Sequence, residues 1–269
     1  MTVVEDYLHK CKGILQTVEN QQEAIHKAAK WFTDSILVGR MVHVFGSGHS
    51  RIMVEEMWPR YGSFAGFNPI VELSLTFHNL VVGANGQRQA MFLENVAGLA
   101  DRILRNFDLS GQDTALVISS SGTNIVPVEM AEIFQQRGIK VVALVTSLHS
   151  AASASKRADG KKLTDFADLI LDTGAPVGDA MVYVPNLDTP IAPGSTVGGA
   201  MLINCLKVET ARLLTEAGHP PKSSVLLPVG AERATSLLEA AYDEHAHRIV
   251  KMYQKVGIPS YVSSESLSP

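Results

Sequence analysis

Two short segments rich in serine, threonine and glycine could bind an anion. Gly46–Ser50 follows the apolar run Met41–Phe45, and Ser119–Asn124 follows Thr114–Ile118. Glycine lets the backbone approach a ligand closely, hydroxyl groups donate hydrogen bonds, and a helix N-terminus favours negative charge. The alternative is that such residues only form tight turns and helix caps. Two such segments after two strands favour a phosphate site, and the missing G-x-x-x-x-G-K-[ST] pattern disfavours nucleotide hydrolysis of the P-loop type.

Two adjacent carboxylates and four histidines could move protons near that site. Glu55 and Glu56 follow the first segment within two helical turns. Burial raises the basicity of a carboxylate, which can then remove the acidic C–H proton beside a carbonyl group. The alternative is a solvated pair on a helix surface. The histidine candidates, each with a surface or structural role as its alternative, are His49, His78, His245 and His247.

Metal ligands and cofactor motifs are not evident in the sequence. His245 and His247 are two residues apart and would point to different faces of a helix. No HExxH, CxxC or EF-hand pattern occurs. We therefore predict no required metal and no cofactor. Cys11 and Cys205 are too few for a disulfide framework, which favours reduced thiols in a cytoplasmic protein.

The charge pattern argues against nucleic acid and membranes as partners. The 269 residues carry a net charge of −4, so no basic surplus could neutralise a run of phosphates. The most apolar window, residues 36–45, contains Arg40 and His43 and is far shorter than the ~20 residues of a membrane span. Charged residues interrupt the N-terminus, so we expect no signal peptide. A basic run, whose first member is Lys156, is predicted to be a solvated loop from which one side chain could reach a ligand phosphate.

Alternating strands and helices must position these side chains. Short apolar runs at Met41–Phe45, Thr114–Ile118, Val141–Val145 and Ala167–Leu171 are typical of parallel strands buried on both faces. Helices are predicted between and after these strands. They are Ile125–Arg137, Val197–Ala217 with Ser195 or Thr196 as its cap, and Leu237–Gln254. This alternation predicts a doubly wound α/β sheet.

The chain reads as one α/β domain with two helical additions. Apolar residues recur at three- and four-residue steps through the first part of the chain, which predicts a single helical arm over residues 1–38. The α/β domain would span 39–218 and a helical extension 219–257. The last residues, 258–269, contain five serines and two prolines and are predicted to be disordered.

Several of these segments resemble the SIS (sugar isomerase) domain superfamily. The resemblance covers residues 35–215 and rests on VHVFGSGHS, LVISSSGTN, VVALVTS, ADLILD and STVGGAMLIN. It is strongest to bacterial phosphosugar-binding SIS proteins of unsettled function, through GSGHS, the Glu-Glu pair and Asn68-Pro69-Ile70. It implies a three-layer αβα sandwich with a flavodoxin-like parallel sheet. It also implies a homodimer or homotetramer with active sites near subunit boundaries, and a sugar phosphate as the small-molecule partner.

The same resemblance implies roles for individual residues. The phosphate-binding positions would be Ser50, Ser119, Ser121, Thr123 and Asn124. Phosphoheptose isomerases have a Glu-Glu pair whose second member acts as a base, which points to Glu56 ahead of Glu55. Those enzymes carry a histidine where this chain has Asn204, so an imidazole would have to come from His78, His49 or His245, and a zinc site of their kind is not expected.

These observations predict an aldose–ketose isomerase acting on a sugar phosphate. Glu56 would move the proton between C1 and C2, and His78 or His49 would assist ring opening or polarise the carbonyl. The first alternative is a lyase similar to N-acetylmuramic acid 6-phosphate etherases, which shares the proton abstraction but expels a substituent at C3. The second is a non-catalytic phosphosugar sensor, which would act on another protein because the chain has no helix-turn-helix segment.

Overall fold

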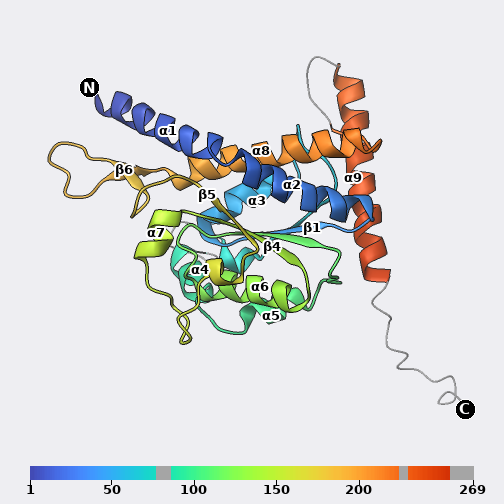
Figure 1. Ribbon diagram of the computed structural model, residues 1–269, viewed down its shortest axis with the longest axis horizontal. Coiled ribbons are helices and arrows are strands. Elements are labelled where there is room, and N and C mark those ends of the chain that lie inside the picture. Colours follow the sequence, from blue (N-terminus) through green and yellow to red (C-terminus); the bar gives the residue numbers. More distant parts are fainter. Residues whose placement is uncertain (77–85, 224–229, 255–269) are drawn as a thin grey trace, which may run out of the picture.

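A five-stranded parallel sheet lies between two layers of helices in the computed structural model, which describes residues 1–76, 86–223 and 230–254 (Figure 1). The strand order is β2-β1-β3-β4-β5, the arrangement of flavodoxin-like proteins. The strands are β1 (Val42–Gly46), β2 (Phe67–Ile70), β3 (Thr114–Ile118), β4 (Lys140–Val145) and β5 (Leu169–Asp172). The predicted fold class is confirmed, although β2 was not expected from the sequence.

The central strands are apolar because both of their faces are covered. Every residue of β1 and β3 is buried. Side chains on one face pack with Phe32 and Leu202, and those on the other face pack with Val126 and Phe134. Uninterrupted Val, Leu and Ile runs are therefore favoured over the alternating pattern of a half-exposed strand.

Helices cover both faces of the sheet (Figure 1). On one side lie α1 (Val3–Glu19), α2 (Gln22–Leu37), α3 (Arg51–Met57) and α8 (Ser195–Glu216), with α9 (Ala231–Gln254) across the end of this layer. On the other side lie α4 (Gln87–Leu93), α5 (Leu99–Leu104) and α6 (Ile125–Gln136). The smaller elements are α7 (Ser147–Ala152), the 3-10 turns η1 (Gly48–Ser50), η2 (Leu73–Leu75) and η3 (Leu163–Phe166), and a hairpin of β6 (Ala180–Val182) and β7 (Ile191–Pro193).

The N-terminal arm differs from the prediction of one continuous helix. It is broken at Asn20 and Gln21, between α1 and α2. The Gln21 side chain donates to the backbone oxygens of Thr17 and Asp172 and accepts from the Asp172 amide at 2.7 Å. The break therefore coincides with a contact between the arm and the end of β5. The residues 258–269 lie outside the described part of the chain, and the domain boundaries remain predictions.

A polar network is buried at the amino end of the sheet. The Asp113 carboxylate accepts hydrogen bonds from Arg40 Nε at 2.8 Å and Arg40 Nη2 at 2.7 Å. His43 Nε2 lies 3.2 Å from Asp113 Oδ2, and Asn68 Nδ2 lies 2.9 Å from His43 Nδ1. With Asn68 as the donor, the imidazole proton is on Nε2, the ring nitrogen close to the carboxylate. Burial would raise the pKa of Asp113, but the contacts of His43 and Arg40 lower it below its usual value.

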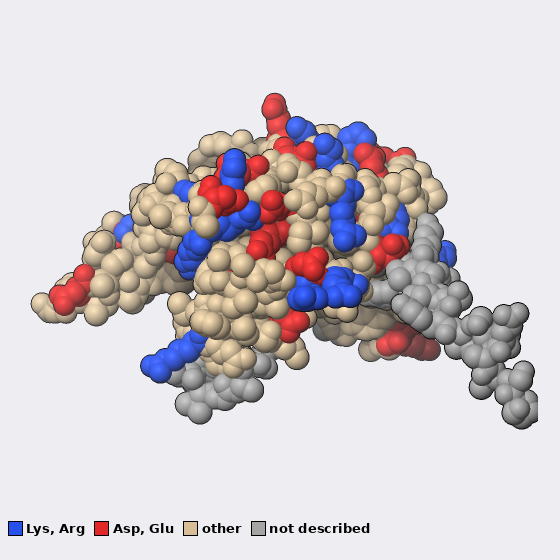
Figure 2. Space-filling model, turned by 90° about the horizontal axis from the view of Figure 1, so that it is seen from below, with Lys and Arg blue, Asp and Glu red and all other residues tan. Residues whose placement is uncertain are grey.

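The face of the molecule in Figure 2 has no extended cationic area among the residues that the structure describes. Acidic and basic side chains are interspersed on that face (Figure 2). Within residues 1–76, 86–223 and 230–254, every helix is too short or too polar to cross a bilayer.

Candidate active site

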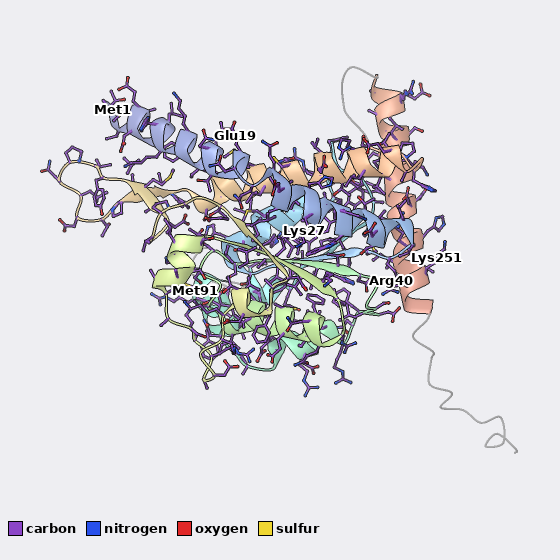
Figure 3. The ribbon with its side chains drawn as sticks, in the orientation of Figure 1. Met1, Glu19, Lys27, Arg40, Met91 and Lys251 are labelled. Carbon is purple, nitrogen blue, oxygen red and sulfur yellow. The ribbon has the colours of Figure 1, made fainter. Side chains whose placement is uncertain are left out.

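A cavity of about 250 Å³ lies at the carboxyl ends of the strands. The chain leaves β1 towards β2 on one side, while β3 lies on the other side, so the cavity is at the point where the strand order reverses. Its walls come from both predicted segments and from α4, the β6 turn and α8, and they include Ser47, Gly48, His49, Ser50, Gln87, Met91, Glu94, Ser120, Thr173, Asp179, Ser195 and Thr196. Figure 3 shows Met91, on α4, at one end of the sheet, and Arg40 and Lys251 at the opposite end.

The segment after β1 forms a tight turn against the cavity. A Cβ atom on Gly46 would lie 2.7 Å from the backbone oxygen of Ser50, so only glycine allows the chain to fold back this closely. His49 and Ser50 line the cavity, as does Ser47, which the sequence analysis did not single out. The Ser47 hydroxyl donates to Glu94 Oε2 at 2.8 Å.

The segment after β3 has an internal framework and an exposed edge. Ser119 is buried, and its hydroxyl accepts from the Gly122 amide at 3.2 Å, which is a structural contact. The hydroxyls of Ser121 and Thr123 lie 2.9 Å apart. Within the described part of the chain, the amides of Ser120 and Ser121 donate no hydrogen bond. Free amides beside paired hydroxyls at the start of α6 are suited to binding an anion.

The cavity contains a carboxylate that the sequence analysis missed, Glu94. It follows α4 directly, and its backbone oxygen accepts from the Val126 amide at 3.0 Å, which fixes it beside the start of α6. Burial raises the pKa of Glu94 above its usual value, against the opposing effects of the Ser47 hydrogen bond, the Lys156 charge and Asn124. The sequence holds one weak signal, because a glutamate at a helix C-terminus opposes the helix dipole.

One member of the basic run approaches this carboxylate. The Lys156 ammonium donates to the side-chain oxygen of Asn124, which is the N-cap residue of α6. Arg157 pairs instead with Glu132 and Asp159. Lys156 is therefore a cation of this run that contacts the predicted phosphate loop.

Glu55 and Glu56 lie in a different hollow, of about 410 Å³, lined also by Arg60, Tyr61 and Tyr242. Glu56 accepts from Asn204 Nδ2 at 2.8 Å, and Lys207 Nζ lies 3.4 Å from the same oxygen. Burial would raise the pKa of Glu56, but Asn204, Lys207 and Arg60 lower it. The exposed Glu55 side chain pairs with Arg51. A lowered pKa makes a carboxylate a weaker base. The catalytic role of Glu55 and Glu56 remains a prediction.

The predicted histidines do not converge on one place. His49 lines the cavity, whereas His78 lies outside the described residues. His245 is on α9, with its ring centre 5.4 Å from that of Trp58. Burial lowers the pKa of His245, with a contribution from Arg248. Assembly into a homodimer or homotetramer, which could bring further groups together, also remains a prediction.

The far wall of the cavity depends on a close approach between α8 and the end of β5. A Cβ atom on Gly198 would lie 1.9 Å from the backbone oxygen of Thr173. The N-cap of α8 differs from the prediction of Ser195 or Thr196. The helix begins at Ser195, and its N-cap residue is Gly194. The Asp179 carboxylate accepts from the amides of both, at 3.1 Å from Gly194 and 2.7 Å from Ser195.

Replacing Gly198 by alanine is expected to push α8 away from Thr173 and to destabilise the protein by about 2 kcal/mol or more, as overpacking does. The matched control is Gly13→Ala in α1, where a Cβ atom would meet nothing within 4 Å. Alanine is a better helix former there by roughly 0.5–1 kcal/mol, so this variant should be at least as stable as the parent. Urea unfolding of both variants measures the difference, and equal stabilities would contradict the close packing.

The residues that the structure describes contain no group of three or more His, Cys, Asp or Glu side chains arranged to hold a metal ion. The sequence-based expectation that neither a metal nor a cofactor is required remains a prediction.

The fold and the cavity are those of a doubly wound α/β protein with a small-ligand cavity at its switch point. The chain belongs to the SIS domain family, whose model matches residues 6–147, more than half of the chain. A UPF0309 protein of Halalkalibacterium halodurans is 36% identical over 217 residues, which are 80% of this chain and 87% of that protein. A UPF0309 protein of Geobacillus kaustophilus is 30% identical over 99% of this chain and all of its own length. A solved phosphoheptose isomerase from Neisseria gonorrhoeae has a TM-score of 0.47 and 13% identity, covering 79% of this chain and 97% of its own.

Proposed function

We propose that this protein binds a sugar phosphate in the cavity and interconverts its aldose and ketose forms. The observation that carries the proposal is Glu94, a carboxylate of raised pKa between the two serine-rich segments. Membership of the SIS domain family supports the ligand class. The phosphate would lie on the segment after β3, against the Ser120 and Ser121 amides and the Ser121 and Thr123 hydroxyls, with Lys156 nearby.

The reaction follows from a base beside an open-chain sugar. Glu94 would remove the C2 proton of the aldose, and the electron pair would form the C1–C2 double bond of an enediol as the carbonyl oxygen O1 is protonated. Loss of the proton on O2 and return of a proton to C1 would give the ketose. His49, in the same cavity, would carry protons to and from the two oxygens. A carboxylate of raised pKa suits the first step because it holds a proton more readily than an ordinary glutamate.

Two assays test the proposal. The first is a thermal-shift screen against sugar phosphates, free sugars, amino-sugar phosphates and inorganic phosphate. A ligand at ~100 times its Kd should stabilise the fold by about 2.7 kcal/mol. In the second assay, the protein is incubated with the selective ligand in D2O. Ketose that carries deuterium at C1, together with exchange at C2 of the recovered aldose, supports isomerisation. Loss of the C3 substituent indicates the lyase, and binding without exchange indicates a sensor.

Removing one hydroxyl of the predicted phosphate loop should weaken binding selectively. Ser121→Ala is expected to raise the Kd of the sugar phosphate by about 10-fold or more, because a hydrogen bond to a charged group contributes roughly 1.5–3 kcal/mol. Isothermal titration measures the change. Ser236→Ala, at an exposed position on α9, is the matched control and should leave the Kd unaltered. An unchanged Kd in Ser121→Ala would remove this hydroxyl from the site.

A further inference from the structure

One acidic side chain of the cavity takes no part in the proposed reaction. Asp179 lies in the turn before β6 with a positive φ of 69°, an uncommon conformation for a residue other than glycine. Its Oδ1 accepts from the Ser195 amide at 2.7 Å, and its Oδ2 accepts from the Ser195 hydroxyl at 2.7 Å. The carboxylate is therefore held in one orientation at the cavity wall.

This contact changes what the α8 terminus can bind. The first amides of a 22-residue helix form a site that attracts anions. Here the protein's own carboxylate occupies the amides of Gly194 and Ser195. A ligand phosphate that approached this wall would meet the negative charge of Asp179 and would find the amides of Gly194 and Ser195 already in use. The amides of Ser120 and Ser121, in contrast, donate to nothing within the described residues. The wall at Asp179 therefore disfavours a phosphate group, whereas the wall at Ser120 and Ser121 can accept one.

The composition of the cavity strengthens this difference. Among its described lining residues there is no lysine or arginine, while Glu94 and Asp179 are both acidic. A second anionic group on a ligand would therefore find no lysine or arginine to pair with among these residues. A neutral hydroxyl group, in contrast, can donate a hydrogen bond to a carboxylate.

We propose that Asp179 determines specificity, by admitting sugar phosphates whose other end is an uncharged polyol or carbonyl and rejecting those with a second anionic group. The inference rests on the proposed function and adds the substrate class: singly phosphorylated neutral sugars, and neither sugar bisphosphates nor phosphorylated sugar acids. Placing like charges together in a site is costly enough for an expected preference on the order of 100-fold.

The test compares ligand pairs that differ in one anionic group. Glucose 6-phosphate is paired with 6-phosphogluconate, fructose 6-phosphate with fructose 1,6-bisphosphate, and arabinose 5-phosphate with 5-phosphoarabinonate. Isothermal titration gives the ratio of Kd values for each pair. In the pair that it binds, the parent protein should prefer the ligand with one anionic group by about 100-fold. In Asp179→Asn, the ratio should fall below about 10-fold, mainly through tighter binding of the ligand with two anionic groups.

Two further variants separate charge from helix capping. Ser195→Ala removes a partner of the carboxylate but keeps its charge, so the preference should persist. Asp179→Ser removes the charge in a second way, so the preference should be lost even if the asparagine variant does not fold. A preference that survives in a folded, uncharged variant, or that is absent from the parent, overturns this inference alone. If no sugar phosphate, in these pairs or in the thermal-shift screen, binds the parent protein, the proposed function and this inference both fail.

Discussion

Glu94→Gln is expected to lower turnover of the sugar phosphate by a factor of about 10²–10⁴, the usual contribution of a positioned general base. The Kd of the ligand should change little, because glutamine keeps an oxygen that accepts from the Ser47 hydroxyl. Proton exchange at C2 in D2O should fall in parallel with turnover. The measurement is a steady-state isomerisation assay together with isothermal titration on the same preparation.

Glu56→Gln is the decisive comparison for this prediction. Glu56 lies in a separate hollow and has a lowered pKa, so this variant should retain most of the parent turnover. Glu239→Gln, at an exposed position on α9, controls for the loss of one negative charge. Normal turnover in Glu94→Gln with a large loss in Glu56→Gln would make Glu56 the base and would contradict our assignment.

The raised pKa of Glu94 predicts two pH effects. The base must be ionised, so kcat/KM of the parent should rise with pH through a pKa above 4.5, and this acidic limb should be absent from any residual activity of Glu94→Gln. A raised folded-state pKa also means that its stabilising effect is present below the unfolded-state pKa and is lost as pH rises through the folded-state value. At pH 7 the glutamine variant should therefore be at least as stable as the parent, which separates a catalytic role from a structural one.

Asp113→Asn is expected to cause a large loss of stability. The Asp113 carboxylate is fully buried and pairs with Arg40, whose side chain is 6% exposed. Removal of one partner of a buried ion pair costs about 3–5 kcal/mol, because the other charge stays buried without compensation. At roughly 2–4 °C per kcal/mol for a chain of this size, the Tm should fall by about 10 °C. Calorimetry or urea unfolding measures the change.

An exposed ion pair gives the control for Asp113. Asp34→Asn removes the partner of Lys30 on α2, where both side chains are more than half exposed. Such pairs contribute little, so the change should stay within about 0.5 kcal/mol. Similar losses in the two variants would show that burial does not govern the Asp113 effect.

The stability that Asp113 contributes should depend on pH in a defined direction. Because its folded-state pKa is lowered, the contribution is present above the unfolded-state pKa and is lost as pH falls through the folded-state value. The difference between the parent and Asp113→Asn should therefore be constant near neutral pH and decrease below about pH 4. A difference that increased on acidification would contradict the direction assigned to this pKa.

The sequence by itself determined the class of fold and the two loops. The apolar runs at β1, β3 and β4 are rich in branched residues and are followed by Gly, Ser or Thr, so local composition marks strand, turn and helix start together. The break between α1 and α2 and the strand β2 were missed. Gln21 is bonded to Asp172, far away in the sequence, and β2 contains a proline within only four residues, so neither feature has a local signal of its own.

The contents of the site were decided by the tertiary structure. Glu56 follows the first loop closely in sequence, but the direction of α3 turns it towards Asn204 and Lys207 on α8. Glu94 and Asp179 belong to no motif, and each enters the cavity because its element is anchored there, by the Val126 amide and by the first amides of α8. A strand pattern is encoded by neighbouring residues, whereas a cavity is formed by residues whose separation in the chain carries no information about their separation in space.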